Sequence, residues 1–226
     1  MSTAKLVEVQ SSSHVEGIVV LVHGGASRRG QAMVSPTQLS VLRMIPLARR
    51  IARSGKGRLA VYRLLNTYRG WDTSHTPVDD VAWAVGEVAR RHGADVPVCL
   101  VGHSLGGRAA ILAANLPAVR SVVALAAFVY PADTDRSGLR DRQVLFVHGL
   151  RDRIAPAGRA RQLAQRMSRD NRVGFIALRR GKHAMLAQHV AFESAADDFV
   201  GATLLGRDPG PPVARVLAGA ALVEVD

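Results

Sequence analysis

Cysteine, lysine, aromatic residues and long hydrophobic runs are all scarce in this chain of 226 residues. The single cysteine, Cys99, excludes an internal disulfide framework and, lying in an apolar run, is expected to be a small buried residue. No apolar stretch reaches the roughly 18 residues of a membrane-spanning helix. The first residues also lack the apolar core of a secretory signal. We therefore expect a cytoplasmic protein that does not enter a membrane.

Acidic residues are scarce relative to basic ones: 18 Asp and Glu stand against 30 Lys and Arg, and the formal net charge is +12. A surplus of this size is typical of proteins that bind nucleic acids. The basic residues are almost all arginines, however, and they are scattered rather than gathered into a basic run. Aromatic residues make up only 4% of the chain. We therefore expect no nucleic-acid partner, and the sequence leaves the oligomeric state open.

Metal-binding patterns are absent as well. The sequence contains no H-E-x-x-H motif and no cluster of cysteines and histidines at metal-ligand spacing. It therefore predicts neither a metal site nor a cofactor.

What the chain does contain is a series of short apolar runs, rich in Val and Leu, that end in glycine or a polar turn. Continuous apolar runs of this length are typical of strands buried on both faces, as in a parallel sheet. The runs are Gly17–His23, Leu59–Leu65, Pro97–Gly102, Ser121–Phe128, Gln143–His148 and Val173–Leu178, with a weaker strand expected at Leu6–Gln10.

Segments with helical periodicity lie between these runs. One helix is predicted over Leu39–Arg53, and another opens with Thr76 as N-cap and Pro77 in its first turn, ending near His92. Further helices are predicted at about 105–116, 157–169 and 187–205. Strands alternating with helices predict an α/β fold with a mostly parallel, doubly wound sheet and helices on both faces. We expect one domain over residues 1–206, and the sequence assigns no structure to 207–226.

The most informative stretch is Gly102-His103-Ser104-Leu105-Gly106, which matches G-x-S-x-G. An apolar run precedes it and a helix-forming run follows it. A serine at the tip of such a tight strand-to-helix turn leaves no room for side chains two residues before and after it, and both positions are glycine. The hydroxyl of Ser104 is then expected at the carboxyl edge of the sheet, where open α/β folds bind ligands.

In this context the chain resembles the α/β-hydrolase superfamily over about residues 17–200. The superfamily carries its catalytic triad in the order serine, acid, histidine. The resemblance implies Ser104 as nucleophile, Asp152 of VLFVHGLRDRIAP as the acid, and His183 of LRRGKHAML as the base. It also implies that Ser104 attacks an acyl carbon, that His183 moves the proton, and that Asp152 orients the imidazole.

Each partner has an alternative in the sequence. Asp135 and Asp141 follow the preceding strand and are alternative acids, while His189 is an alternative base inside the last predicted helix. The histidines of the two His-Gly pairs, His23 and His148, are expected to fix neighbouring loops through hydrogen bonds.

The resemblance also implies an oxyanion hole. One N–H would come from Leu105, after the nucleophile, and the other from Gly25, or Ala26 in its place, in the loop HGGAS. The candidate substrate pocket contains Ala26, His103, Tyr68 and Trp71.

The short connection between the runs at Ser121–Phe128 and Gln143–His148 leaves room for a loop rather than a lid domain. This compact form resembles dienelactone-hydrolase-like proteins and small carboxylesterases, although the former typically carry cysteine where this chain has Ser104. The resemblance implies a serine hydrolase that cleaves a small ester, thioester or lactone through an acyl-enzyme. The alternatives are an acyltransferase or thioesterase step with the same triad, and a ligand-binding member of the fold without catalysis.

Overall fold

The computed structural model describes residues 3–12, 14–25, 32–71, 75–133, 139–186 and 188–226. An eight-stranded sheet runs through it in the order β1-β3-β2-β4-β5-β6-β7-β8. The strands are β1 (Lys5–Gln10), β2 (Gly17–Val22), β3 (Leu59–Leu65), β4 (Val98–His103), β5 (Val119–Leu125), β6 (Gln143–Gly149), β7 (Arg172–Leu178) and β8 (Leu222–Val225). The helices are α1 (Leu39–Leu42), α2 (Met44–Ser54), α3 (Thr76–His92), α4 (Leu105–Leu112), α6 (Ala157–Met167), α7 (His189–Leu205) and α8 (Pro211–Leu217).

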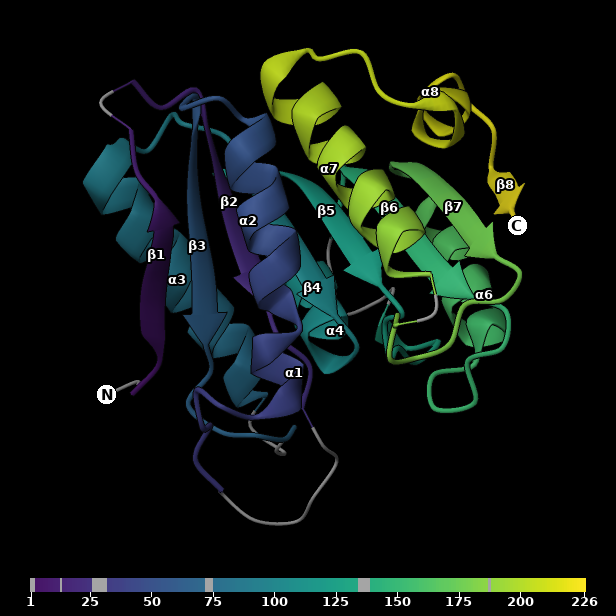
Figure 1. Ribbon diagram of the computed structural model, residues 1–226, viewed down its shortest axis with the longest axis horizontal. Helices are drawn as coiled ribbons and strands as arrows, with labels where there is room; N and C mark the ends of the chain where they lie inside the picture. Colours follow the sequence, from purple (N-terminus) through teal and green to yellow (C-terminus); the bar gives the residue numbers. More distant parts are fainter. Residues whose placement is uncertain (1–2, 13, 26–31, 72–74, 134–138, 187) are drawn as a thin grey trace.

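Helices cover both faces of this sheet (Figure 1). The pairing of β1 with β3 is antiparallel, and every other pair of neighbouring strands is parallel. One hydrophobic core lies between the sheet and α3, α4 and α6, and a second lies between the sheet and α2, α7 and α8. Strands β2 and β4 are buried along their whole length, which explains their continuous apolar sequences. The predicted fold class is confirmed.

Helix α4 ends at Leu112 rather than near residue 116, and two other helices also differ from the prediction. The segment expected as one helix over Leu39–Arg53 is divided at Arg43 into α1 and α2. Pro46 explains the division, because proline has no N–H and its ring clashes with the carbonyl four residues earlier. The N-cap of α3 is His75, with φ 58° and no side-chain capping bond, and Thr76 is the first helical residue. The prediction of Thr76 as N-cap was therefore wrong.

The last twenty residues of the chain add to the sheet. Helix α8 crosses over and returns the chain as β8, which pairs parallel with β7 from Phe175 to Leu178. Gly174 lets α8 approach closely, since a Cβ there would stand 1.8 Å from a methyl carbon of Val216. The segment that the sequence left unassigned is thus an ordered edge of the sheet.

Two features of the fold bear on access to the site. Strand β5 ends at Leu125 and β6 begins at Gln143, so the connection is too short for a lid domain, as predicted. The parallel strands place their carboxyl ends at one edge, the lower edge in Figure 1. Across the described residues, none of the helices has the length and apolar character needed to cross a membrane.

Candidate active site

Ser104 stands alone between strand β4, which ends at His103, and helix α4, which begins at Leu105. Its backbone has φ 56° and ψ −120°, a conformation that non-glycine residues rarely adopt. The turn is held by the Ser104 N–H, which donates to the Leu125 carbonyl at 2.9 Å, and by the Phe128 N–H, which donates to the Ser104 carbonyl at 3.1 Å. The strained turn is thereby fixed from the neighbouring strand β5.

The glycines on either side of Ser104 are required by close backbone contacts. A Cβ on Gly102 would stand 2.3 Å from the carbonyl oxygen of Gly106, and a Cβ on Gly106 would stand 2.4 Å from the carbonyl oxygens of Val22 and His23. These distances are far inside van der Waals contact, so the elbow cannot form with larger residues at either position.

A chain of hydrogen bonds joins the three predicted catalytic side chains. His183 Nε2 lies 2.9 Å from Ser104 Oγ, and His183 Nδ1 lies 2.9 Å from Asp152 Oδ2. Ser104 and Asp152 are buried, while the side chain of His183 keeps 15% of its surface exposed. When Nδ1 carries the proton and donates it to Asp152, Nε2 is free to accept the proton of Ser104.

The loop after β6 prepares the carboxylate of Asp152 for this contact. The N–H groups of Ile154 and Ala155 donate to Asp152 Oδ1 at 2.9 and 2.8 Å, so Oδ2 is left to face His183. His148 Nε2 lies 3.4 Å from Oδ2 and donates to the Ala155 carbonyl at 2.7 Å. Burial raises the pKa of the Asp152 carboxyl, but the contacts with His148 and His183 outweigh it and hold the pKa well below its usual value. Asp152 is therefore ionised at neutral pH.

The alternative acid and base lie elsewhere. Asp141 precedes β6, at the sheet edge opposite the carboxyl ends, where its N–H donates to the Asp170 carbonyl. Asp135 lies outside the described residues. His189 is the first residue of α7, and its Nδ1 lies 3.2 Å from the Leu186 carbonyl.

The two predicted oxyanion donors, Leu105 and Gly25, lie at the start of α4 and in the loop after β2. Leu105 is the first residue of α4, so its N–H has no acceptor within the helix. A Cβ on Gly25 would stand 3.4 Å from Leu105 Cδ1 and only 2.0 Å from the Arg69 carbonyl oxygen. The backbone at Gly25 is therefore pressed against that of Arg69, beside the Leu105 side chain, in a place that only glycine can occupy. Ala26, the alternative donor, lies outside the described residues.

Two buried histidines support the elbow and the loop after β2. His23 Nδ1 donates to the Gly24 carbonyl at 2.6 Å, because Nε2 already accepts the Asn66 N–H at 3.1 Å. His103 Nε2 donates to the His183 carbonyl at 2.9 Å, which ties the base loop to the elbow. Burial is the main reason that the pKa of His103 is lowered to about 3, so this ring is neutral.

The two predicted aromatic pocket residues have different surroundings. Tyr68 pairs through its backbone with Met33 in an isolated bridge. Trp71 covers the guanidinium of Arg108 at 4.2 Å, and Tyr130 lies against the same guanidinium at 4.7 Å. Arg108 is buried and forms a bidentate pair with Asp133. Trp71 thus packs beside α4.

Two hollows adjoin His183, and neither is lined by Tyr68 or Trp71. The first is lined by the polar residues Asp152, His183, Arg151, Arg153 and Lys182 among apolar ones. The second is largely apolar and lies between α2 and α7, with Leu125 and Met185 in its lining. The second hollow could not be expected from the sequence, because it is formed by two helices that lie far apart in the chain.

The model of the alpha/beta hydrolase family matches residues 19–226. The chain belongs to the α/β hydrolase family. A comparison with curated protein sequences gives no match. Within the parts of the chain that the structure describes, no group of three or more His, Cys, Asp or Glu side chains is placed to hold a metal ion.

Solved structures share this α/β hydrolase fold at low sequence identity. A protein of unknown function from Agrobacterium tumefaciens, described as an α/β hydrolase, has a TM-score of 0.69 and 16% identity, over 92% of this chain and 95% of that one. A lidless α/β serine hydrolase from Xanthomonas campestris has a TM-score of 0.64 and 17% identity, over 89% of both chains. Est1E from Butyrivibrio proteoclasticus, with ferulic acid bound, has a TM-score of 0.62 and 12% identity, over 89% of this chain and 96% of that one.

Proposed function

We propose that this α/β hydrolase cleaves a small ester, thioester or lactone through a covalent acyl-enzyme on Ser104. The observation that carries the proposal is the unbroken chain from Ser104 Oγ through the His183 ring to Asp152 Oδ2, with both distances at 2.9 Å. A serine hydroxyl is a weak nucleophile by itself and gains reactivity from a base that an acid orients. The family membership, the lidless serine hydrolase and an esterase domain from Rhodothermus marinus among the structural neighbours support the same reaction class.

The proposed reaction has two halves. Ser104 Oγ attacks the acyl carbon while His183 Nε2 takes its proton, and the C–O or C–S bond to the leaving group breaks as His183 returns that proton to it. Water then attacks the acyl-enzyme with His183 again as base, which frees the acid and restores Ser104. In both halves the negative charge on the carbonyl oxygen is stabilised by the N–H groups of Leu105 and Gly25.

Asp152 acts through His183 in this scheme. Its carboxylate holds the ring in the tautomer with the proton on Nδ1 and stabilises the imidazolium formed in each half-reaction. The lowered pKa of Asp152 keeps it ionised while His183 gains and loses its proton.

The test is steady-state hydrolysis of short p-nitrophenyl esters by matched variants. Ser104→Ala and His183→Ala are each expected to lower kcat by roughly three orders of magnitude or more. His14→Gln is the control, because the side chain of His14 is 85% exposed. His189→Gln tests the alternative base, which bonds to Leu186 rather than to the triad. Undiminished hydrolysis by Ser104→Ala would overturn the proposal, and a larger loss in His189→Gln than in His183→Ala would reassign the base.

A further inference from the structure

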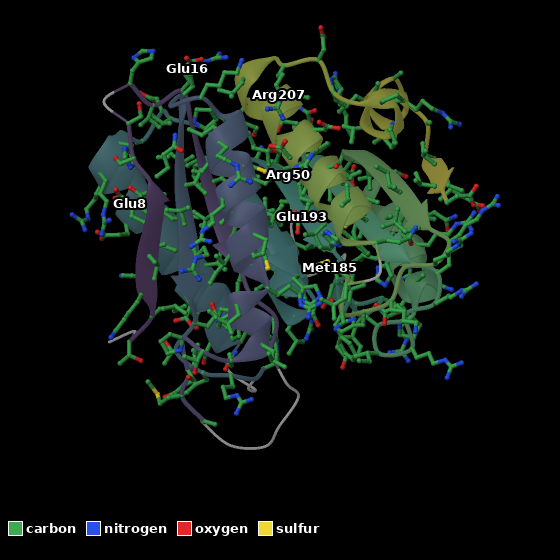
Figure 2. The ribbon with its side chains drawn as sticks, in the orientation of Figure 1. Glu8, Glu16, Arg50, Met185, Glu193 and Arg207 are labelled. Carbon is green, nitrogen blue, oxygen red and sulfur yellow. The ribbon has the colours of Figure 1, made fainter. Side chains whose placement is uncertain are left out.

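Helices α2 and α7 lie side by side on one face of the sheet and are joined at the end away from the triad. Asp197 of α7 is buried there and accepts a hydrogen bond from Ser54 at the end of α2. Arg50 and Arg207 lie 3.6 and 3.4 Å from the same carboxylate. In Figure 2, Arg207, Arg50, Glu193 and Met185 follow one another down the seam between the two helices. The upper part of this seam is therefore closed by ion pairs.

The lower part of the seam opens into a cavity of about 540 Å³ between α1, α2 and the start of α7. Its lining is mainly apolar and includes Leu39, Leu42, Leu47, Leu125, Met185 and Phe192. Leu39 and Leu186 at its rim keep 78% and 69% of their surface exposed. An apolar cavity of this volume is within the range of small-molecule sites.

This cavity begins beside the catalytic residues. Leu125 lines it, and the carbonyl of Leu125 accepts the N–H of Ser104. Ala184, which follows His183 in the chain, lines both this cavity and the other hollow at His183. The Met185 N–H donates a hydrogen bond to the Lys182 carbonyl, which closes a turn around His183. This turn places the buried Met185 in the cavity wall. A group attached to the acyl carbon at Ser104 can therefore extend into the cavity.

One charged residue in this lining, Arg43, has no counter-ion among the residues that the structure describes. Arg43 is half-buried, and its Nη1 is buried without a hydrogen-bond partner among the described residues. Burial lowers the pKa of Arg43, but a guanidinium stays charged at neutral pH. Arg43 lines the same cavity as Leu125, which accepts the Ser104 N–H, and Ala184, which follows His183 in the chain. A partly buried guanidinium with an unpaired N–H group is costly, and an anionic ligand group would relieve that cost.

Glu193 is the acidic residue of the same lining and has to be considered as a partner for Arg43. In the upper part of the seam, Arg50 and Arg207 form ion pairs with Asp197. Among the described residues, no ion pair within 4.0 Å joins Arg43 to Glu193. The guanidinium is therefore available to a ligand, with Glu193 as a nearby negative charge that weakens binding of an anion.

We propose that the cavity between α2 and α7 binds the acyl chain of the substrate and that Arg43 binds a carboxylate carried by this chain. The proposal rests on the ester hydrolysis proposed above. The preferred substrates are then half-esters of dicarboxylic acids of medium chain length. The apolar lining accepts the methylene groups, and the planar guanidinium offers paired N–H donors that match a carboxylate.

The experiment compares two esters of one chain length: mono-p-nitrophenyl suberate, which carries a free carboxylate, and methyl p-nitrophenyl suberate, which does not. The readout is the ratio of kcat/KM for the first over the second, measured by release of p-nitrophenol. The unmodified enzyme is expected to favour the free carboxylate by about tenfold or more, as for one hydrogen-bonded charge pair. Arg43→Gln is expected to bring the ratio to about one, and Glu193→Gln to raise it.

The control is Arg49→Gln, which removes the same charge from an exposed position of α2 and is expected to leave the ratio and the basal activity unchanged. A ratio near one in the unmodified enzyme, unaffected by Arg43→Gln, would overturn the assignment of Arg43 while both esters are still hydrolysed. A second result would also overturn it: the ratio stays unchanged in both single variants, and the loss of stability in the double variant Arg43→Gln/Glu193→Gln differs from the sum of the two single losses. That result would show that Arg43 and Glu193 pair with each other. Hydrolysis of neither ester, or hydrolysis that survives Ser104→Ala, would instead refute the proposed esterase function.

Discussion

The backbone of Gly149 lies directly against the backbone of Gly181. A Cβ on Gly149 would stand 2.2 Å from the carbonyl carbon and oxygen of Gly181. Gly149 ends β6 just before the loop of Asp152, and Gly181 lies in the loop of His183. The Arg151 N–H donates to the Gly181 carbonyl at 3.0 Å across the same contact. The two loops that carry the acid and the base are therefore held against each other at this glycine–glycine contact.

Gly149→Ala is expected to separate these loops. The added methyl group has no space, so either the strand end or the His183 loop has to move, and the stability of the fold is expected to fall by about 1–3 kcal/mol. The kcat for ester hydrolysis is also expected to fall, even under conditions where Gly149→Ala is fully folded, because the substitution stretches the contact between Asp152 and His183. Urea unfolding and ester hydrolysis measure the two effects.

The control for this substitution is Gly158→Ala. Gly158 is exposed on α6, and a Cβ there meets no atom within 4 Å. Alanine at a helical position is expected to raise stability by up to about 1 kcal/mol and to leave activity unchanged. Equal behaviour of the two variants would contradict the account of the Gly149–Gly181 contact.

The strained backbone at Ser104 gives a second prediction, on stability rather than on rate. Both Ser104→Gly and Ser104→Ala remove the nucleophile, but only glycine adopts φ 56° and ψ −120° without strain. The free energy of unfolding of Ser104→Gly is expected to be higher than that of Ser104→Ala by up to about 1 kcal/mol. This holds although glycine makes the unfolded chain more flexible. A clearly less stable glycine variant would show that the turn stores no strain at this residue.

The buried ring of His103 predicts a dependence of stability on pH. Its pKa is about 3 in the folded protein, mainly because of burial, and about 6.5 in an unfolded chain. As the pH falls from 6.5 toward 3, the unfolded state therefore binds a proton that the folded state does not, and stability declines by up to about 1.4 kcal/mol per pH unit. Above pH 6.5 this contribution is fully present.

Urea unfolding at a series of pH values tests this dependence. His103→Gln is expected to reduce the slope of the free energy of unfolding against pH below pH 6.5. Part of the slope remains because burial also lowers the pKa of His23. His14→Gln is the control, because the side chain of His14 is 85% exposed. If His103→Gln and the unmodified protein lose stability equally as the pH falls, His103 protonates in the folded protein and its assigned state is wrong.

Asp197 gives a fourth prediction, at the closed end of the α2–α7 seam. Asp197→Asn removes the charge that faces Arg50 and Arg207, and the loss of stability is expected to be about 2 kcal/mol. The exposed Asp95 is a matched control, and Asp95→Asn is expected to change stability by less than about 0.5 kcal/mol. Similar unfolding midpoints for the two variants would show that these ion pairs do not hold the helices together.

The sequence predicted the strands and the elbow well for physical reasons. A parallel strand buried on both faces has to be apolar along its length, so runs such as Gly17–His23 are recognisable without any tertiary information. The elbow is equally local, because the clashes that require Gly102 and Gly106 arise within a few residues of Ser104 and from the adjacent end of β2.

Features that depend on the approach of distant segments were beyond such reasoning. Strand β8 has only four residues and is defined by its pairing with β7 rather than by its own composition. The cavity beside Arg43 exists because α2 and α7, which lie far apart in the chain, separate near the triad. The isolated sequence around Arg43 gives no sign that its guanidinium has no counter-ion in the described part of the chain.

The central claim, that Ser104 forms a covalent intermediate with the help of His183 and Asp152, is tested most directly by labelling with a fluorophosphonate and peptide mass spectrometry. One label on Ser104 is predicted in the unmodified enzyme, with labelling slowed strongly in His183→Ala and lost in Ser104→Ala. A label on another residue, or ester hydrolysis by an enzyme whose Ser104 stays unlabelled, would contradict the claim.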